Sequence, residues 1–356
     1  MTMAHPHLAV AALTLAATLA SMAARPSDRV PLDRPVLFAS DRTGDFELYV
    51  RLPDATEVAL TDNGVSDFDA RWAPDGRRIA WIRGDRAAAE LWIAELDITG
   101  RDARLVPGSD RQVTTNDVLD IDPAWTPDGQ GIVVSRGSSG GFGDEDLWLV
   151  DLAPAPDPDG QDPDPGVPPL PLPLPPDGSG TSDTSVAERR LTSSSLSDRD
   201  PALSPDGTRL VFARGKSGDD GTDQAPSDLH VMSLDVPETA GGAVHNLTAH
   251  LDRSASTREH RARWTWFGGE ERIVFAKWWG GGGASTLWSM RPDGSDAREL
   301  TPGNRVATYP SPMADGRVVY DEVRKDTNSD LYLLEGSSTI RLTKTTGRDT
   351  TPDVQP

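Results

Sequence analysis

A segment that recurs along the chain constrains its fold more than any other feature. It reads DFDARWAPDG at 67–76, DIDPAWTPDG at 120–129 and DRDPALSPDG at 198–207, with weaker copies at 258–269 and 306–316. After each copy come a short β-branched or aromatic run, a turn rich in Gly and Asp, a second apolar run and a closing Leu-Thr or Val-Thr. Self-similarity of this kind indicates that one supersecondary unit is repeated.

The two ends of the chain complement each other. The first unit lacks its opening strand and begins at VLFAS (36–40), whereas the last residues, DTTPDVQP (349–356), match an opening strand. A strand that is missing at the start and present at the end lets the C-terminal strand complete the first sheet of a closed ring. With the first unit counted, the sequence therefore predicts an all-β fold over 36–356, a six-bladed β-propeller of four-stranded antiparallel blades closed by the C-terminal strand, rather than an open solenoid.

Composition agrees with short strands and frequent turns. The chain has 33 Gly, 30 Pro and ten Trp, and Pro-Asp-Gly is a favoured tight-turn sequence. Aromatic residues occupy equivalent positions of different units: Trp72, Trp125 and Trp264 in one row, and Trp92, Trp148 and Trp288 with Tyr49 and Tyr332 in another. Because a buried aromatic side chain removes roughly 150–250 Å² from water, we expect both rows to pack between blades.

The units resemble the repeat of the TolB-type six-bladed β-propeller, which is related to WD-repeat propellers. SDRTGDFELY (40–49) and the three intact Pro-Asp-Gly copies carry this resemblance, which covers about 36–356. It does not extend to the α/β domain that precedes the propeller in TolB, and it implies a fold rather than a function, since propellers host many unrelated roles. Peptidases with such a propeller carry a hydrolase domain after it, and we expect no such domain here.

Two segments lie outside the repeats. Residues 8–20 are an apolar run, shorter than the ~20 residues that span a bilayer, and small residues follow it. This pattern predicts a signal peptide at 1–24, a short linker at 25–35 and a periplasmic or secreted protein. Residues 153–188 are rich in Pro and Asp, which predicts a disordered insertion at the edge of a blade.

Charge and motif content exclude several classes of function. Asp and Glu number 56 against 35 Lys and Arg, a formal net charge of −21, whereas nucleic-acid binders depend on basic side chains. We therefore expect no nucleic-acid partner, and no membrane span. The chain has no Cys, which excludes disulfides and thiolate chemistry. Ser139 lies in a G-x-S-x-G match, but between two expected strands without the helix that a nucleophile elbow needs, so we attribute the match to chance.

Carboxylates introduce the opening strands. They are Asp67, Asp69, Asp120, Asp122, Asp198, Asp200 and Asp349. Opening strands line the central channel of such propellers, so these side chains are candidates for a Ca²⁺ site at one channel mouth, where the ion would need 6–8 oxygen ligands. The alternative is that each Asp accepts backbone N–H groups in its own turn.

Trp278 and Trp279 precede four glycines and replace the polar turn of the first unit. We expect them at a hairpin tip, where exposed paired aromatic residues are typical of a platform for a partner or a sugar. The alternative is that they fold back over a hydrophobic blade edge.

These observations predict an exported, non-enzymatic, monomeric scaffold that binds a protein or peptide partner of the cell envelope at a channel face. The alternative is a lyase or hydrolase that acts on saccharides or lactones with a channel cation, through the Asp rows and the two Trp residues.

Overall fold

The computed structural model describes a chain built almost entirely from β-strands. The described residues are 32–85, 89–116, 118–137, 143–152, 187–216, 225–251, 256–279, 284–324 and 328–356. Helical structure in these ranges is confined to two single 3-10 turns, η2 (Glu238–Ala240) and η3 (Ala249–Leu251). None of the helices in these ranges has the length and apolar character that a membrane crossing requires.

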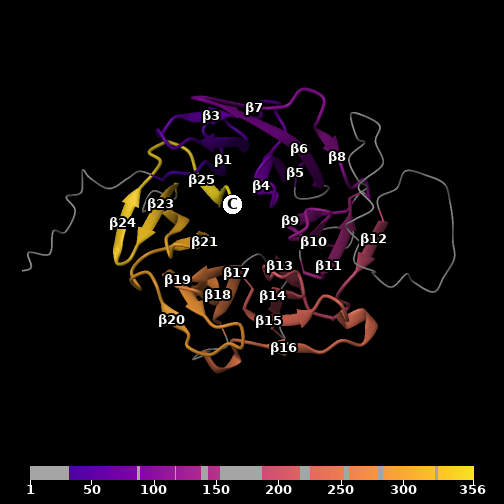
Figure 1. The fold of residues 1–356 in the computed structure, drawn as a ribbon. Helices are drawn as coiled ribbons and strands as arrows, with labels where there is room; N and C mark the ends of the chain where they lie inside the picture. Colours follow the sequence, from indigo (N-terminus) through magenta and orange to yellow (C-terminus); the bar gives the residue numbers. More distant parts are fainter. Residues whose placement is uncertain are drawn as a thin grey trace, which may run out of the picture.

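The strands form five hydrogen-bonded sheets, which Figure 1 shows arranged around a common centre. Three of these sheets are antiparallel and contain the strands nearest the two ends of the chain. The first contains, in spatial order, β25 (Asp349–Val354), β1 (Val36–Ser40), β2 (Glu47–Arg51) and β3 (Glu57–Ala59). The second contains β4 (Asp67–Trp72), β5 (Arg78–Arg83), β6 (Glu90–Thr99) and β7 (Asp102–Leu105), with β8 (Arg111–Gln112) also on β6. The last contains β21 (Ala307–Pro312), β22 (Val318–Val323), β23 (Ser329–Glu335) and β24 (Ser338–Arg341).

The middle of the chain forms the remaining two sheets. One contains β9 (Asp120–Trp125), β10 (Gly131–Arg136), β11 (Asp146–Asp151) and β12 (Ala187–Arg190). The other has eight strands: β13 (Asp198–Leu203), β14 (Arg209–Gly215), β15 (Ser227–Ser233), β16 (Val244–Asn246), β17 (Arg258–Phe267), β18 (Glu270–Trp278), β19 (Ser285–Met290) and β20 (Arg298–Glu299). Its two antiparallel halves meet at one parallel pairing, Ser227 with Arg258.

The C-terminal strand pairs with the first strand of the chain. β25 runs antiparallel to β1, with Asp349 opposite Ser40 and Val354 opposite Val36. Asp349 accepts a hydrogen bond from Ser40 Oγ at 2.6 Å and pairs with Arg42 at 2.9 Å. The two ends of the chain therefore belong to one sheet, as the sequence pattern predicted.

The innermost strands share an unusual backbone feature. In Figure 1 the strands that face the centre are β4, β9, β13, β17, β21 and β25. Each has one non-glycine residue with φ between 45° and 56°: Asp69, Asp122, Asp200, Arg261, Tyr309 and Thr351. Around each of these residues the register with the neighbouring strand shifts. Such bulges bend a strand and redirect a side chain, which distinguishes these residues from their neighbours in the same strand.

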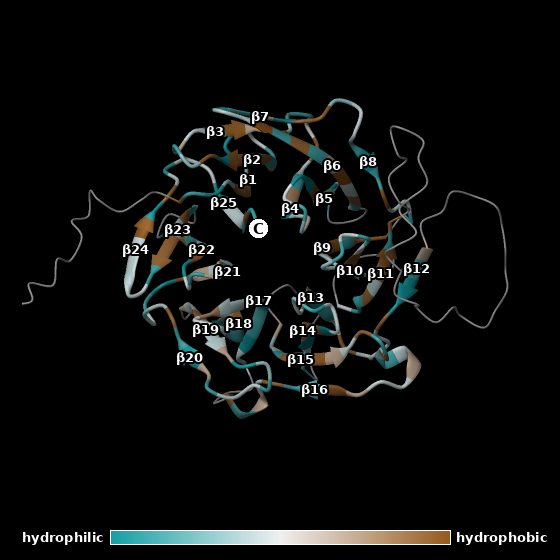
Figure 2. Cartoon of the chain, viewed as in Figure 1, coloured by the Kyte–Doolittle hydropathy of each residue, from teal (hydrophilic) through white to brown (hydrophobic). Residues whose placement is uncertain are grey.

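The apolar cores lie between neighbouring sheets, as the aromatic rows predicted. One cluster joins Leu48 and Val50 of β2 to Trp72 and Trp81 of the next sheet. Trp125 Nε1 donates across sheets to the carbonyl of Arg71 at 3.2 Å, which fixes the orientation of the indole. Figure 2 shows that β17 differs from this pattern, because its inner part is mostly hydrophilic.

The threonine that closes each repeat has the same partner in every copy. Its Oγ1 accepts the backbone N–H of a buried leucine in the third strand at 2.8–3.0 Å. The pairs are Thr61 with Leu48, Thr114 with Leu91, Thr192 with Leu147, Thr248 with Leu229, Thr301 with Leu287, and Thr343 with Leu331. The Leu-Thr signature is therefore a structural element of the repeat.

Replacing Thr192 with Val is expected to lower the free energy of unfolding by about 1–3 kcal/mol, because the buried N–H of Leu147 loses its acceptor. Urea denaturation measures this loss. The control is Thr99→Val, at an exposed strand end, with an expected change within about 0.5 kcal/mol. Equal losses of stability for Thr192→Val and Thr99→Val would contradict the structural role assigned to the closing threonine.

Several predicted segments lie wholly or partly outside the described residues. The signal peptide (1–24), Ser139 and most of the 153–188 insertion lie outside, but Ala187 and Glu188 belong to β12. The described part of the predicted linker packs on the sheets: Leu32 is fully buried in a cluster with Met313 of the last sheet.

Candidate functional site

A cavity of about 540 Å³ lies at the centre, between strands that are far apart in the sequence. Its wall includes five residues with left-handed φ: Asp69, Asp122, Arg261, Tyr309 and Thr351. Apolar side chains complete much of the remaining wall: Phe46, Phe68, Leu119, Ile121 and Val323. The bulges thus turn one residue from each of five strands toward a shared space that is part charged and part apolar.

Arg261 holds two carboxylates from other strands. Its Nη1 donates to Asp122 Oδ1 at 2.5 Å and also to Asp200 Oδ1. The guanidinium carbon lies 4.3 Å from the ring centroid of Tyr309, which is a cation–π arrangement. Burial opposes ionisation of Asp200, but the charges of Arg261, Arg258 and Arg263 together outweigh it and lower the pKa of that carboxyl. A buried, charged cluster therefore joins β9, β13 and β17.

Two other polar side chains of the cavity wall have no such partners among the described residues. Asp69 is 6% exposed, and its carboxylate makes no hydrogen bond or ion pair with any described residue. Thr351 is 3% exposed, and no described group is a hydrogen-bond partner of its Oγ1. The strands that carry them are neighbours, since Asp353 Oδ2 of β25 accepts the backbone N–H of Trp72 in β4 at 2.8 Å.

Asp321 of β22 is a third buried carboxyl of the cavity wall. It accepts hydrogen bonds from Thr308 Oγ1 at 2.6 Å and from Thr350 Oγ1 at 2.7 Å. Burial raises the pKa of Asp321 to about 6, against which the two hydroxyl donors act only partly. This group can accept or release a proton near neutral pH.

Asp321→Asn is expected to change how stability depends on pH. Because the folded pKa of Asp321 lies above the unfolded value, its protonation favours the folded state, and the wild type loses this contribution as pH rises from about 4 to 6. As the pH rises from 4 to 7, the free energy of unfolding of the variant should therefore increase by about 2–3 kcal/mol relative to that of the wild type. Urea denaturation across this range measures the difference, and the exposed Asp62→Asn is the control. A difference that does not vary with pH would contradict the assignment.

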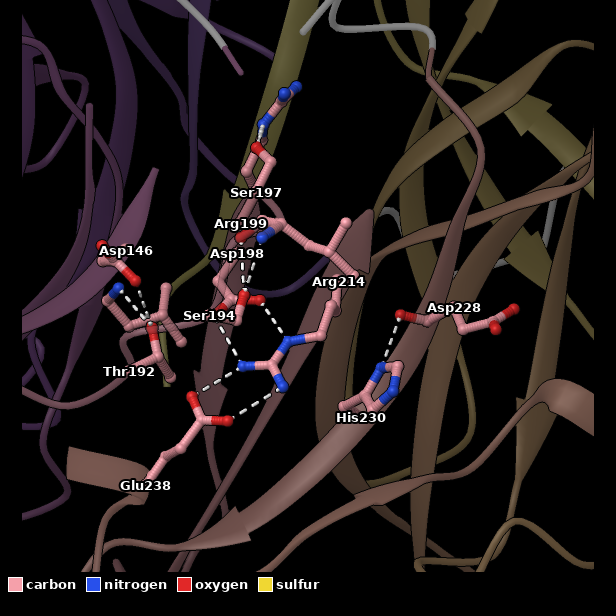
Figure 3. A network of polar contacts seen from close by, with 12 residues as sticks. Asp146, Thr192, Ser194, Ser197, Asp198, Arg199, Arg214, Asp228, His230 and Glu238 are labelled. Atoms are coloured by element: carbon pink, nitrogen blue, oxygen red, sulfur yellow. Dashed lines mark hydrogen bonds and ion pairs between the residues drawn. The ribbon is translucent and has the colours of Figure 1, made fainter. Parts of the chain in front are cut away.

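Four of the seven predicted metal ligands are in ion pairs within their own sheets. Each is fully buried against an arginine at 2.6–2.9 Å: Asp67 with Arg83, Asp120 with Arg136, Asp198 with Arg214, and Asp349 with Arg42. In Figure 3 the Asp198–Arg214 pair continues to Glu238, whose Oε2 lies 2.9 Å from Arg214. Burial raises the pKa of Asp198 to about 6, although Arg214 opposes this shift. These carboxylates stabilise single sheets.

The remaining three, Asp69, Asp122 and Asp200, lie nearer the centre, and Asp122 and Asp200 share Arg261 as a partner. In the part of the chain that the structure describes, no three acidic or imidazole side chains lie close enough together to hold one metal ion. The Ca²⁺ site therefore stays a prediction, and the arrangement of these carboxylates does not favour it.

Trp278 and Trp279 are both half-buried. The Trp279 ring lies 6.1 Å from that of Trp288 in an edge-to-face arrangement, and Lys277 Nζ lies 4.9 Å from its centroid. This packing favours the alternative in which the pair covers a blade edge. The partner platform stays a prediction.

Sequence reasoning missed Arg261, Asp321 and Thr351 as members of the central site. Arg261 and Thr351 align with Asp69 when the repeat copies are superposed, so a change of residue type at one repeat position was the available signal. Asp321 belongs to a second strand, where the pattern of apolar runs gave no such signal.

No family model matches the sequence. A curated relative from Bacillus subtilis (strain 168), named the uncharacterized peptidase YuxL, is 31% identical over 191 residues. The match covers 49% of this chain and 26% of the relative, so this chain spans only part of the length of that protein.

Solved structures establish the type of fold. TolB from Acinetobacter baumannii matches with a TM-score of 0.63 at 15% identity, over 92% of this chain and 68% of that one. A puromycin-hydrolyzing peptidase from Mycobacterium tuberculosis matches with a TM-score of 0.50 at 14% identity, over 87% of this chain and 43% of that one. The chain therefore has a TolB-like propeller fold.

The prediction of a non-enzymatic scaffold is wrong, because the curated relative is named a peptidase. The expectation that the protein is not an enzyme fails for the same reason. Composition and the lack of a recognised motif, on which both rested, do not report on a site formed by residues distant in sequence.

Proposed function

We propose that this chain is a six-bladed propeller of a peptidase-type enzyme and that its central cavity holds the peptide substrate. The observation that carries the proposal is the 191-residue match to a protein named a peptidase. The cavity described above supports it, because that cavity is large enough for a peptide segment and combines apolar with charged walls.

Six blades account for the sheets more simply than five. The eight-stranded sheet divides at the single Ser227–Arg258 pairing into two antiparallel groups of the same order as the others. The closing threonine bond and the left-handed inner residue recur once in each resulting group. The pairing of β25 with β1 supports a ring fastened by the two chain ends.

The cavity has the general properties of a site for a peptide. Its volume of about 540 Å³ falls within the ordinary range of ligand pockets. Phe68, Leu119 and Ile121 offer apolar contacts for side chains, while Asp69 and Thr351 offer acceptors. We assign substrate binding to this cavity and cleavage of the peptide bond to none of its residues.

Export is also part of the proposal. The apolar run at 8–20 supports a signal peptide, which would place the enzyme in the periplasm or outside the cell.

A mixed pool of peptides tests the proposed binding role of the cavity. We expect the purified protein to retain a subset of the pool, identified by mass spectrometry, and to bind these peptides in calorimetric titration. No retained peptide and no heat of binding, from a preparation whose circular dichroism shows folded β-structure, would contradict the proposal.

A further inference from the structure

The cavity contains a buried carboxylate to which no described residue supplies a counter-charge. The cationic side chains of the wall are each held by a carboxylate: Arg261 by Asp122 and Asp200, Arg199 by Glu145 at 3.0 Å, and Arg348 by Asp41 at 2.7 Å. No described residue does the same for Asp69. Burial of an ionised carboxylate without a partner is costly, so the site favours a ligand that brings the missing positive charge.

Backbone geometry aims Asp69 at the cavity. Its φ is 52°, and the register of β4 with β5 shifts between Phe68 and Arg71, where the strand bends. Thr351 has the same φ of 52° at the equivalent place in the neighbouring β25, and its hydroxyl has no hydrogen-bond partner in the described structure. The two strands thus present to the same cavity a carboxylate and a hydroxyl, both without a partner among the described residues.

We propose that Asp69 and Thr351 bind the protonated amine of the ligand that occupies this cavity. The inference rests on the proposed function in taking that ligand to be a peptide. An ammonium group has three N–H donors, which suits a carboxylate and a hydroxyl plus one water. A calcium ion needs 6–8 oxygen ligands, more than this pair supplies. Phe68 and Leu119, which share the wall, provide an apolar surface for the side chain next to the amine.

Calorimetric titration of the full chain at pH 7 with three peptides tests the inference. The probes are Phe-Ala-Ala amide, its N-acetyl form, and N-acetyl-Phe-Ala-Lys amide, which separate an α-amine from a lysine amine. We expect a free amine to improve binding about 10- to 100-fold over the neutral acetylated peptide, as a charge-assisted hydrogen bond does. Whichever of the two charged peptides binds more tightly identifies the source of the amine.

Two variants and a control locate the effect. Asp69→Asn should reduce the preference for a charged peptide to about threefold or less, and Thr351→Val should weaken binding of the amine about three- to tenfold. The control is Asp54→Asn in the β2–β3 turn, which removes one charge from an exposed position and should leave the preference unchanged. A preference that survives Asp69→Asn overturns the inference.

Small amines separate this inference from the proposed function. 2-Phenylethylamine and 2-phenylethanol share an aromatic body and differ in charge. If the amine alone binds, in a way that depends on Asp69, while no peptide does, the inference stands and the peptidase proposal fails. If peptides bind without regard to their amine or to Asp69, the inference fails and the proposed function stands. If neither peptides nor amines bind, both are overturned.

Discussion

Replacing Arg261 with Met is expected to lower the free energy of unfolding at pH 7 by about 3–5 kcal/mol. The guanidinium is the shared partner of Asp122 and Asp200, which are 6% and 5% exposed. Its removal leaves two buried carboxylates without their main counter-charge, while Met fills much of the vacated volume. Urea denaturation of the variant and the wild type gives the difference.

The same substitution should alter the pH dependence. In the wild type the depressed pKa of Asp200 contributes stability that is present above the unfolded value and is lost as pH falls through the folded value. Without Arg261, only the charges of Arg258 and Arg263 still oppose the effect of burial, so we expect the pKa of Asp200 to rise. Acidification from pH 7 toward 4 should therefore stabilise the variant relative to the wild type. The difference in free energy of unfolding between the wild type and the Arg261→Met variant should therefore decrease as the pH falls.

Two further variants control this experiment. Arg104→Met removes the surface pair with Asp97, where Arg104 is 66% exposed, and should cost no more than about 1 kcal/mol. Adding Asp200→Asn to the Arg261→Met variant should restore part of the lost stability at pH 7, because one unpaired charge is gone. A loss no greater than that of Arg104→Met would show that the buried cluster does not contribute as argued.

The sequence predicted the strands of the repeats and the pairing of the chain ends, because both depend on local patterns. The opening copies at 120–125 and 198–203 coincide with β9 and β13, and the surplus copy at the C-terminus is β25. The apolar residues that a strand buries can be recognised from the hydrophobic pattern of its own sequence. The strand assignments therefore followed from apolar runs that recur at equivalent positions of the repeat.

The roles of the carboxylates could not be predicted in this way. Asp67 and Asp69 are two residues apart, which in a regular strand places both side chains on one face. The bulge at Asp69 breaks that relation, so Asp67 turns to Arg83 while Asp69 turns to the cavity. Arg261 interrupts the acidic pattern of the opening strands, yet that interruption supplies the charge that holds Asp122 and Asp200.

Deletion of residues 349–356 is expected to lower the melting temperature by roughly 10 °C or more, or to prevent folding, because β25 connects the first and last sheets. It forms the ladder with β1, and Asp349 is the buried partner of Arg42. On its other side Thr350 donates to Asp321 at 2.7 Å. Its loss would expose the edge of β1 and open the central cavity, so aggregation should accompany unfolding.

A rearranged chain separates the loss of the strand from the loss of eight residues. Gln355 N donates to the carbonyl of Pro35 at 2.9 Å, so the end of β25 lies beside the start of β1. Placing 349–356 ahead of Leu32, which is buried, through a short linker that contains Asn-Gly keeps the antiparallel pairing and should restore a melting temperature close to that of the full chain. Thermal unfolding followed by circular dichroism gives the melting temperatures of the full chain, the deletion variant and the rearranged chain. A deletion variant that melts within about 2 °C of the full chain, or a rearranged chain that fails to recover, would show that pairing of the two ends does not fasten the fold.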